Sequence, residues 1–206
     1  MSGFVRKTGY YTGVVYEWNL PTGSSCPFAQ ECKVTVDRIT GKFDVKRGQY
    51  RCYAASAERF PAVRKSRWDN YTQTLAGIPP VPPKDCKAVR IHMSGDFYNQ
   101  AYFDMWLSVA EQHPHIEFWA YTKSLTYWVA RLDRIPTNLI LTASYGGRLD
   151  ALIERHNLKN VQIYRHPSLV PPDRPIDTND DWARRPHVNF ALIDNNTIGK
   201  DKQKQL

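Results

Sequence analysis

Short apolar segments alternate with amphipathic segments along the second half of this chain, and this alternation constrains the fold more than any other feature. Apolar runs of about six residues suit strands, while apolar residues three or four positions apart are typical of helices. Strands regularly separated by helices indicate βαβ units and a parallel sheet. The sequence therefore predicts an α/β fold built as an open, partial β/α barrel. We expect strands at 88–93, 116–121, 138–143, 161–164 and 187–193, and helices at 100–112, 125–132 and 148–156.

A proline-rich stretch, IPPVPPK at 78–84, is the clearest boundary in the chain. Proline has no backbone N–H and disfavours helix immediately before it, so we expect a connection there. A length of 206 residues suits one filled core better than two. The prediction is a single α/β domain over 1–206, with a cysteine-bearing basic segment at 1–87 followed by βα repeats at 88–206.

The positive charge of the chain is unevenly distributed. The formal net charge is +8, and the excess of Lys and Arg lies within residues 1–90. One interpretation is a surface for nucleic acid, in which Trp68 and Tyr71 stack on bases beside the basic run at 64–67. The other is that this charge compensates thiolates and otherwise forms a solvated face. Both interpretations stay open at this point.

The chain shows no sequence feature of a membrane or secreted protein. No stretch has the roughly 20 apolar residues that cross a bilayer, and the first ten residues lack the apolar core of a secretion signal. We expect a cytoplasmic protein without membrane contact. Because the cytosol keeps thiols reduced, its four cysteines are expected to bind metal or to be simply buried rather than to form disulfides.

Three cysteines precede the βα repeats: Cys26 and Cys32 lie in CPFAQEC, and Cys52 lies in RCYAA. Glycine, serine and proline around the first of them allow the tight turns that let thiolates converge. This spacing by itself is compatible with an iron–sulfur cluster, with zinc or with no metal. Cys86 lies at the start of the strand predicted at 88–93, and about 26 Å of extended chain separates it from Ser94. We therefore expect Cys86 at the opposite end of the sheet from the metal, where it could not be a ligand.

Polar residues gather where the predicted strands end. The carboxyl ends of parallel strands share one edge of the sheet, and that edge usually carries the ligand site. Each residue also has a plainer explanation, since Asp96 suits a helix cap and Gly146 a turn. Their repetition at successive strand ends favours a common site. The candidates are His92, Ser94, Gly95, Asp96, Lys123, Ser124, Ser144 and Arg165.

Four segments of the chain resemble a family of bacteriophage proteins, the gene-product-88 family. They are WNLPTGSSCPFAQEC, RCYAASAE, VRIHMSGDFYNQAYFDMW and HIEFWAYTKS, in that order. In this chain KVTVDRITGKFDVKRGQY separates the second and third cysteines. With Gly41 and Gly48, that insertion is predicted to form a hairpin.

The family in turn resembles radical S-adenosylmethionine enzymes, although their tight CxxxCxxC loop is absent here. That resemblance implies a [4Fe-4S] cluster held by Cys26, Cys32 and Cys52, with one iron open to S-adenosylmethionine. It also implies that Tyr53 packs on the cluster and that Gly95 lets the backbone approach the cofactor. Arg90 and His92 are expected on one strand face. The implied cofactor-binding set is Tyr53, His92, Ser94, Gly95, Asp96, Lys123, Ser124, Ser144 and Arg165.

Three classes of function follow from these features. The first is an iron–sulfur enzyme of radical type acting on a small molecule, a nucleotide or nucleic acid. The second is a non-catalytic iron–sulfur or zinc module that binds nucleic acid or a host protein. The third is a metal-dependent nuclease using Asp96 and Glu117, which lacks the lysine its motif needs after Glu117. The sequence assigns neither the substrate nor the oligomeric state.

Overall fold

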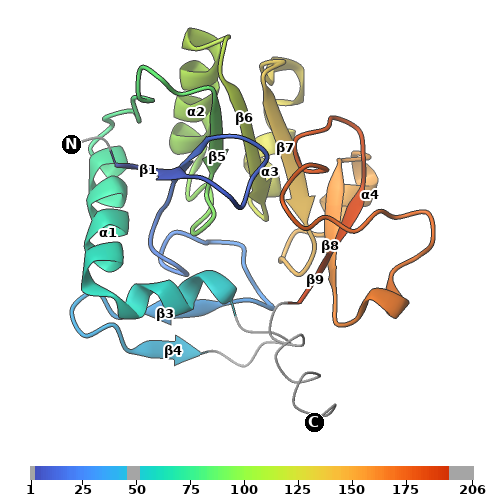
Figure 1. The fold of residues 1–206 in the computed structure, drawn as a ribbon, viewed down its shortest axis with the longest axis horizontal. Helices are drawn as coiled ribbons and strands as arrows, with labels where there is room; N and C mark the ends of the chain where they lie inside the picture. The colour runs from blue at the N-terminus through green and yellow to red at the C-terminus, as the bar shows by residue number, and fades with distance from the viewer. Residues whose placement is uncertain (1–2, 46–51, 195–206) are drawn as a thin grey trace.

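The computed structural model of this protein describes residues 3–45 and 52–194. The fold is mixed α/β, with one large sheet and a separate hairpin (Figure 1). The strands are β1 Phe4–Lys7, β2 Val15–Trp18, β3 Val34–Val36, β4 Phe43–Val45, β5 Ala88–Ile91, β6 Glu117–Thr122, β7 Leu139–Ser144, β8 Asn160–Tyr164 and β9 Phe190–Ile193. The α-helices are α1 Pro61–Leu75, α2 Gln100–Gln112, α3 Leu125–Val129 and α4 Ala151–Arg155. The 3-10 helices are η1 Tyr53–Arg59, η2 Leu132–Arg134 and η3 Pro167–Leu169.

The large sheet has seven strands in the order β1-β2-β5-β6-β7-β8-β9. Only β1 and β2 are antiparallel, and every later neighbour is parallel. From β2 onward the spatial order therefore follows the chain order, as expected when each crossover has the same hand. β1 and β9 form the two edges, so the sheet is open within the described residues.

The strands predicted from periodicity are confirmed to within a few residues, and the helix at 100–112 is confirmed at both ends. Asn99 explains its start, because the Asn99 side chain accepts a hydrogen bond from the backbone N–H of Tyr102 at 2.8 Å. The helix predicted at 148–156 is too long: it begins only at Ala151, since Asp150 holds the N–H groups of Gly146 and Gly147 in a turn. The helix at 125–132 likewise ends at Val129.

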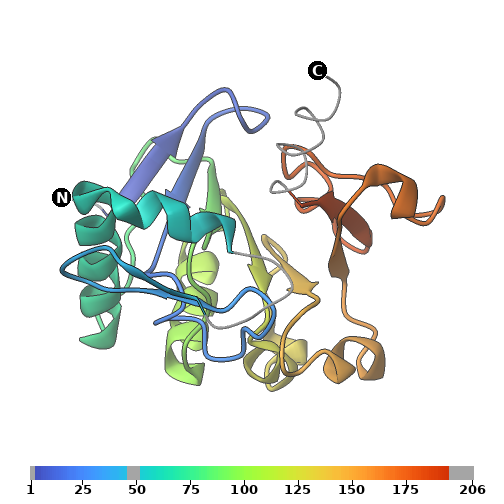
Figure 2. The same cartoon turned by 90° about the horizontal axis from the view of Figure 1, so that it is seen from below.

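The two faces of the sheet are buried against different partners. Alternate residues such as Val89 and Ile91 of β5 join the larger core beneath α2, α3 and α4. Figure 2 shows these three helices along the same side of the sheet. Ala88, just before Val89, and Trp119 of β6 face the other way, into a smaller cluster with Tyr11. Within the described ranges, no helix is both long and apolar enough to span a bilayer.

The crossover from β2 to β5 carries the cysteines and most of the unpredicted structure. It contains the β3–β4 hairpin, which turns through Gly41 at φ +71°; Gly48 lies outside the described residues. It also contains α1, whose buried positions are polar: Arg64, Arg67, Asn70 and Thr74. These residues have helical spacing but no apolar signal, so hydrophobic periodicity did not predict α1.

Candidate metal centre

The segment bearing Cys26 and Cys32 lies against the carboxyl ends of the parallel strands. It follows β2 directly, and the backbone N–H of Leu20 donates to the carbonyl of Ser94, just beyond β5, at 2.9 Å. The hydroxyls of Thr22 and Ser94 are 2.9 Å apart. In Figure 1 the segment lies beyond the arrowheads of β6 and β7. The predicted edge of the sheet is therefore the edge on which the cysteine segment packs.

The same segment is also fixed to the end of β7. Gln30 donates its backbone N–H to the carbonyl of Gly146 at 3.3 Å, and Arg148 donates to the carbonyl of Phe28 at 2.9 Å. Lys33 links the two ends of the loop, because its ammonium donates to the carbonyls of Gly23 and Cys26 at 2.7 Å each. The loop between the two cysteines is thus held at both sides.

Gly95 lets the strand-end loop approach the cysteine segment closely. Its φ of +92° is left-handed, and a Cβ there would lie 2.6 Å from Leu20 Cβ and 2.7 Å from Ser25 Oγ. Any larger residue would have to push this segment away. In this structure Gly95 therefore contacts the protein segment that leads to Cys26.

Cys52 reaches the same region from the other side of the crossover. Cys52 precedes η1, and Glu58 near the end of η1 accepts the backbone N–H of Thr22 at 2.6 Å. Arg67 of α1 completes the link with an ion pair to Glu58 at 2.8 Å and a hydrogen bond to the carbonyl of Ala54 at 3.0 Å. Sequence patterns did not single out Glu58, because a lone acid in a short helix carries no periodic signal.

Burial and neighbouring charges raise the pKa values of the three thiols. Burial is the main cause that raises the pKa of Cys26, with further upward contributions from Asp96, Cys52 and Cys32. Burial also raises the pKa of Cys52 to about 11, and the Cys32 charge adds to this, while hydrogen bonds from the backbone of η1 lower it. Residues 26 and 52 are thus close enough in space for their charges to interact. Among residues 3–45 and 52–194, however, no three His, Cys, Asp or Glu side chains are gathered as ligands of one metal ion.

Asp96 organises the strand ends beside these thiols. Its carboxylate accepts the hydroxyl of Thr122 at 2.6 Å and the backbone N–H groups of Lys123 and Phe97 at 2.9 and 2.8 Å. Asp96 is therefore not the cap of the following helix, a role that Asn99 fills. Burial raises the pKa of Asp96, and these hydrogen bonds oppose that rise.

Lys123 joins the ends of β6 and β7. Its ammonium donates to Ser144 Oγ at 2.6 Å and to the carbonyl of Tyr145 at 2.7 Å. Its charge lowers the pKa of Cys32, although burial makes the net shift upward. Ser124 donates to the carbonyl of Phe97 at 2.6 Å. The predicted residues at these strand ends are thus brought together, mainly as partners of one another.

His92 does not share a face with Arg90, and that expectation is wrong. His92 leaves β5 in a left-handed conformation, at φ +65°, which turns its side chain into the core. There its ring packs against Phe97, and Nε2 lies 2.8 Å from the hydroxyl of Tyr102. Burial lowers the pKa of His92 to about 3.

Arg90 faces the opposite side, in a buried charge network that sequence patterns missed. It pairs with Asp180 at 3.0 Å and donates to the hydroxyl of Tyr11 at 3.1 Å. Asp180 also accepts hydrogen bonds from Trp119 and Tyr121. Asp180 lies in an irregular loop, where no periodicity marks it for burial.

Tyr53 links this network to the cysteine segment. Its hydroxyl lies 3.4 Å from Arg90 Nη2 and donates to the carbonyl of Met93 at 3.0 Å, although half of the residue is exposed. Since Tyr53 directly follows Cys52, it connects the candidate centre to the buried network around Arg90.

Arg165 lies at the edge of this region, in a separate cavity of about 290 Å³. Glu31, Tyr145, Gln162 and Asp194 also line the cavity. Because Glu31 is the neighbour of Cys32, the cavity opens beside the cysteine segment.

Cys86 and Glu117 lie at the other end of the sheet. Cys86 is fully buried two residues before β5, and its thiol contacts the carbonyl of Ala88 at 3.5 Å. Glu117 opens β6 and pairs with Arg184 at 2.6 Å. Asp96 contacts the residues at the carboxyl end of the same strand, so Asp96 and Glu117 cannot share the cations of a nuclease site.

Comparison with known proteins identifies the relatives of this chain. The family described as gene product 88 matches residues 5–203. The chain belongs to the gene product 88 family. A curated relative, the Gene 88 protein of Mycobacterium phage L5, is 41% identical over 159 residues, which make up 64% of this chain and 59% of the phage protein. The family resemblance drawn from the four sequence segments is thereby confirmed.

This member of the gene product 88 family spans about 59% of the length of that phage relative. No solved structure matches the chain. The family assignment therefore links this chain to bacteriophage proteins. Its chemistry has to be argued from the site.

Proposed function

We propose that this protein holds an iron–sulfur cluster on Cys26, Cys32 and Cys52. The observation that carries the proposal is that the segments bearing Cys26 and Cys52 pack together at the carboxyl edge of the sheet, through Leu20 on Ser94 and Thr22 on Glu58. The Cys52 charge there raises the pKa of Cys26, after the larger effect of burial. Thiolates are the usual ligands of such clusters. Their position at the carboxyl ends of parallel strands is also where α/β folds place their cofactor sites.

The surroundings suit deprotonated thiols that bind metal. Burial alone disfavours a thiolate, and metal binding offsets that cost because the ligand must lose its proton. Backbone groups of Ala54 and Ala55 are positioned to stabilise a charged Cys52, and the Lys123 ammonium does the same for Cys32. Hydrogen bonds and positive charge around the sulfurs are the outer partners that metal sites commonly need.

An iron–sulfur cluster and a single zinc ion require different spacings of their thiolate ligands. Zn–S bonds of about 2.3 Å draw four ligands tightly around one atom. A cluster places several iron and sulfide atoms between its ligands, so the thiolates spread more widely. The sulfide and zinc contents of the purified protein therefore decide between the two.

A radical-type enzyme is the form of this function that we favour. Apart from the separate β3–β4 hairpin, the strands from β2 to β9 follow one another in the sheet as they do along the chain, which is the order of a partial β/α barrel. Three cysteines leave one iron without a protein ligand, and a reduced cluster of that kind supplies one-electron chemistry to a bound cofactor such as S-adenosylmethionine.

The test is anaerobic purification with quantification of iron, sulfide and zinc, for the wild type and for Cys26→Ser, Cys32→Ser and Cys52→Ser. We expect iron and sulfide in the wild type, absorption near 400 nm, and loss of both in each variant. Cys86→Ser is the matched control, because Cys86 lies at the opposite end of the sheet, and it should keep its iron. Reductive cleavage of S-adenosylmethionine by the wild type then separates an enzyme from a binding module.

Two outcomes would contradict the proposal. Zinc without sulfide in the wild type would show a single-ion site. Equal iron in the wild type and in a Cys26→Ser, Cys32→Ser, Cys52→Ser triple variant would show that these thiols are not the ligands.

A further inference from the structure

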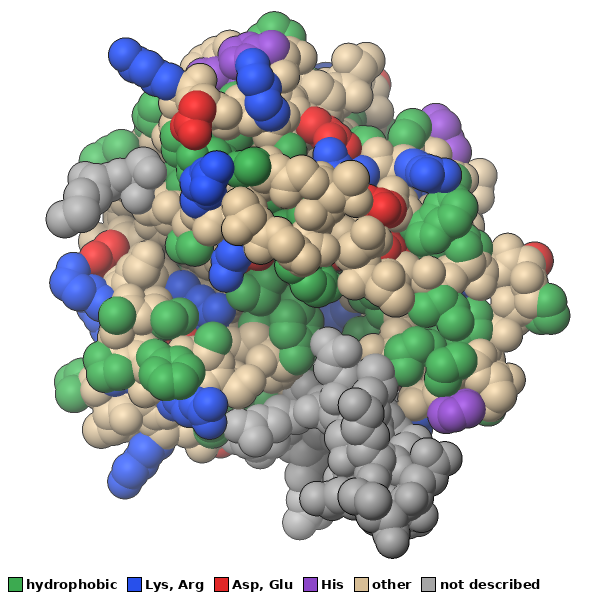
Figure 3. All heavy atoms as spheres, viewed as in Figure 1, with side chains coloured by type: hydrophobic (Ala, Val, Ile, Leu, Met, Phe, Trp, Pro, Cys, Tyr) green, Lys and Arg blue, Asp and Glu red, His purple; other side chains and the backbone are tan. Residues whose placement is uncertain are grey.

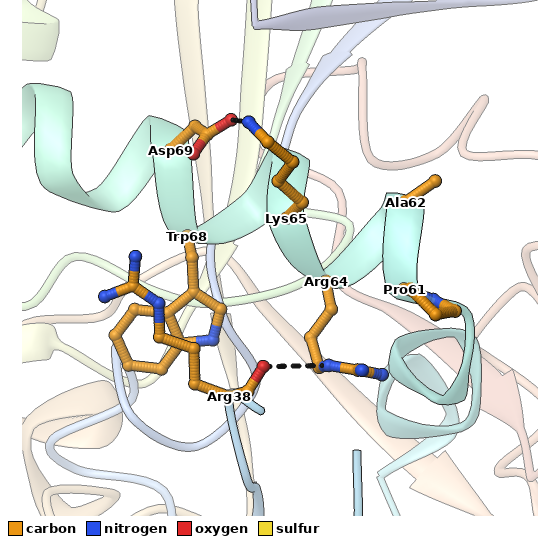
Figure 4. A pocket seen from close by; sticks show the side chains of 7 residues that line it. All are labelled: Arg38, Pro61, Ala62, Arg64, Lys65, Trp68 and Asp69. Atoms are coloured by element: carbon orange, nitrogen blue, oxygen red, sulfur yellow. Dashed lines mark hydrogen bonds and ion pairs between the residues drawn. The ribbon is translucent and has the colours of Figure 1, made fainter. Parts of the chain in front are cut away.

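The surface of the crossover contains a groove that shares no residue with the candidate metal centre. It lies between the β3–β4 hairpin and the first half of α1, has a volume of about 380 Å³, and is lined mainly by Arg38, Arg64, Lys65, Trp68 and Asp69 (Figure 4). We call it the Trp68 groove.

An aromatic ring and an arginine are stacked in the Trp68 groove. The exposed Arg38 guanidinium lies 5.0 Å from the centroid of the Trp68 ring. The Trp68 Nε1 donor is buried but has no hydrogen-bond partner within the described residues. Next to the groove, Arg59 lies over the half-exposed ring of Phe60 at 4.9 Å. Arg side chains stack on aromatic rings and are also preferred partners of phosphate groups in nucleic acids.

The structure separates the structural arginines of α1 from those that are available to a ligand. Arg64 is buried and donates to the carbonyls of Arg38 and Ile39 at 3.0 Å each, which fixes the hairpin to the helix. Arg67 is buried against Glu58. The basic run in the sequence is therefore largely scaffolding, and the exposed cation it contributes is Lys65, which pairs with Asp69 in solvent.

Tyr71 is likewise unavailable as a stacking surface. Its ring packs edge-on against Trp68 and against Tyr98, at centroid distances of 5.8 and 4.9 Å. Of the two aromatic residues expected to stack, only Trp68 lines the groove.

The charge of this half of the protein favours an anionic ligand. Residues 1–90 contain 15 Lys and Arg against 7 Asp and Glu, whereas residues 91–206 contain 13 of each. Figure 3 shows Lys and Arg side chains among hydrophobic ones on the face over α1 and the hairpin. Arg38 and Arg59 have no carboxylate partner among the described residues, so their guanidinium groups can move onto phosphates.

We propose that the Trp68 groove binds single-stranded nucleic acid, with a base stacked on Trp68 and phosphates held by Arg38, Arg59 and Lys65. A duplex hides the faces of its bases, whereas a single strand offers them for stacking. Movement of Arg38 from the Trp68 ring to a phosphate frees the ring for the base. Arg64 and Arg67 hold this surface to Glu58, and so to the cysteine segment, as one scaffold.

The experiment measures fluorescence anisotropy of labelled 20-mers of dT and of rU, and of a DNA duplex of the same length, over a range of salt concentrations. The wild type should bind one of the single strands at least ten-fold more tightly than the duplex, with the DNA and RNA arms showing which sugar is preferred. Trp68→Ala should weaken that binding about ten-fold or more without changing the salt slope. Trp68→Phe should retain most of it.

Arg38→Gln should reduce the steepness of the plot of log affinity against log salt by about 0.7, the value for one phosphate contact on a single strand. Arg155→Gln is the matched control, because Arg155 is an exposed arginine on α4, away from the groove. It should leave both affinity and slope unchanged. Thermal melting of each variant confirms folding, and if Trp68→Ala fails to fold, Arg38→Gln and Arg155→Gln decide.

Three results would overturn the inference: no preference of the wild type for single strands, wild-type binding by a folded Trp68→Ala, or equal losses in Arg38→Gln and Arg155→Gln. The last would show that binding follows net charge alone. The metal site is tested separately, because Cys52→Ser should lose iron and still bind the oligonucleotide.

Discussion

Arg67 and Glu58 form an ion pair inside the protein, with 2.8 Å between Arg67 Nη1 and Glu58 Oε1 and almost no exposure of either side chain. The same Glu58 oxygen accepts the backbone N–H of Thr22. One carboxylate thus joins α1, η1 and the segment that leads to Cys26. This pair therefore helps to hold the segments that carry Cys26 and Cys52 against each other.

Replacing Glu58 should be strongly destabilising. Glu58→Ala leaves the Arg67 charge buried without a partner, which costs about 3–5 kcal/mol of the free energy of unfolding. The exposed pair Lys65–Asp69 is the comparison, and Asp69→Ala should cost no more than about 0.5 kcal/mol. Urea unfolding at neutral pH measures both. A Glu58→Ala variant as stable as Asp69→Ala would contradict the structural role of the pair.

Gly95 should be far less tolerant of a side chain than Gly77. Both have left-handed φ, +92° and +75°, so alanine is strained at either position by about 1–2 kcal/mol. A Cβ at Gly77 meets nothing within 4 Å, whereas one at Gly95 collides with Leu20 and Ser25. Gly95→Ala should therefore lose about 1–3 kcal/mol more in urea unfolding. It should also bind less iron, while Gly77→Ala keeps the wild-type amount.

Buried His92 should make the protein less stable in weak acid. Its pKa is about 3 when folded, below the ordinary value near 6.5, so from pH 6.5 down to 3 only the unfolded chain takes up the proton. The contribution of His92 to the free energy of unfolding is fully present above pH 6.5. It decreases as the pH drops and is smaller by about 2 kcal/mol at pH 5. His92→Asn, which tolerates the positive φ, should lack this contribution. Urea unfolding at pH 7.5 and 5.0 compares the two proteins, and identical pH dependence would refute the assignment.

Arg90 and Asp180 should be coupled in a double-mutant cycle. Arg90→Met or Asp180→Asn alone leaves one buried partner uncompensated and should cost about 3–5 kcal/mol. Arg90→Met combined with Asp180→Asn should cost clearly less than the sum, by at least about 1.5 kcal/mol, since neither charge then remains. Lys159, whose ammonium donates to the carbonyls of Trp182 and Ala183 at 3.1 and 2.6 Å, supports the same loop. Additive losses in urea unfolding would show that the pair does not hold that loop on the sheet.

Periodicity predicted the parallel strands and α2 because these elements bury apolar faces, and apolar faces leave a repeat in the sequence. It did not predict β1 and β2, or α1. The buried positions of α1 are polar, and β2 carries the buried Glu17, which accepts the hydroxyl of Tyr11 at 2.6 Å. Where burial is achieved by hydrogen bonds and ion pairs, the hydrophobic pattern carries no trace of it.

The amino-acid sequence by itself determined the α/β class, the family and the edge of the sheet at which the polar strand-end residues gather, because strand direction and loop position follow from the order of elements along the chain. Tertiary structure alone decided which side chains meet. It brought Cys52 near Cys26, paired Arg67 with Glu58, and turned His92 away from Arg90 through one left-handed residue. The reason is physical: a repeat records burial of one face, whereas contacts between distant segments depend on turns, charges and single backbone angles that leave no repeat.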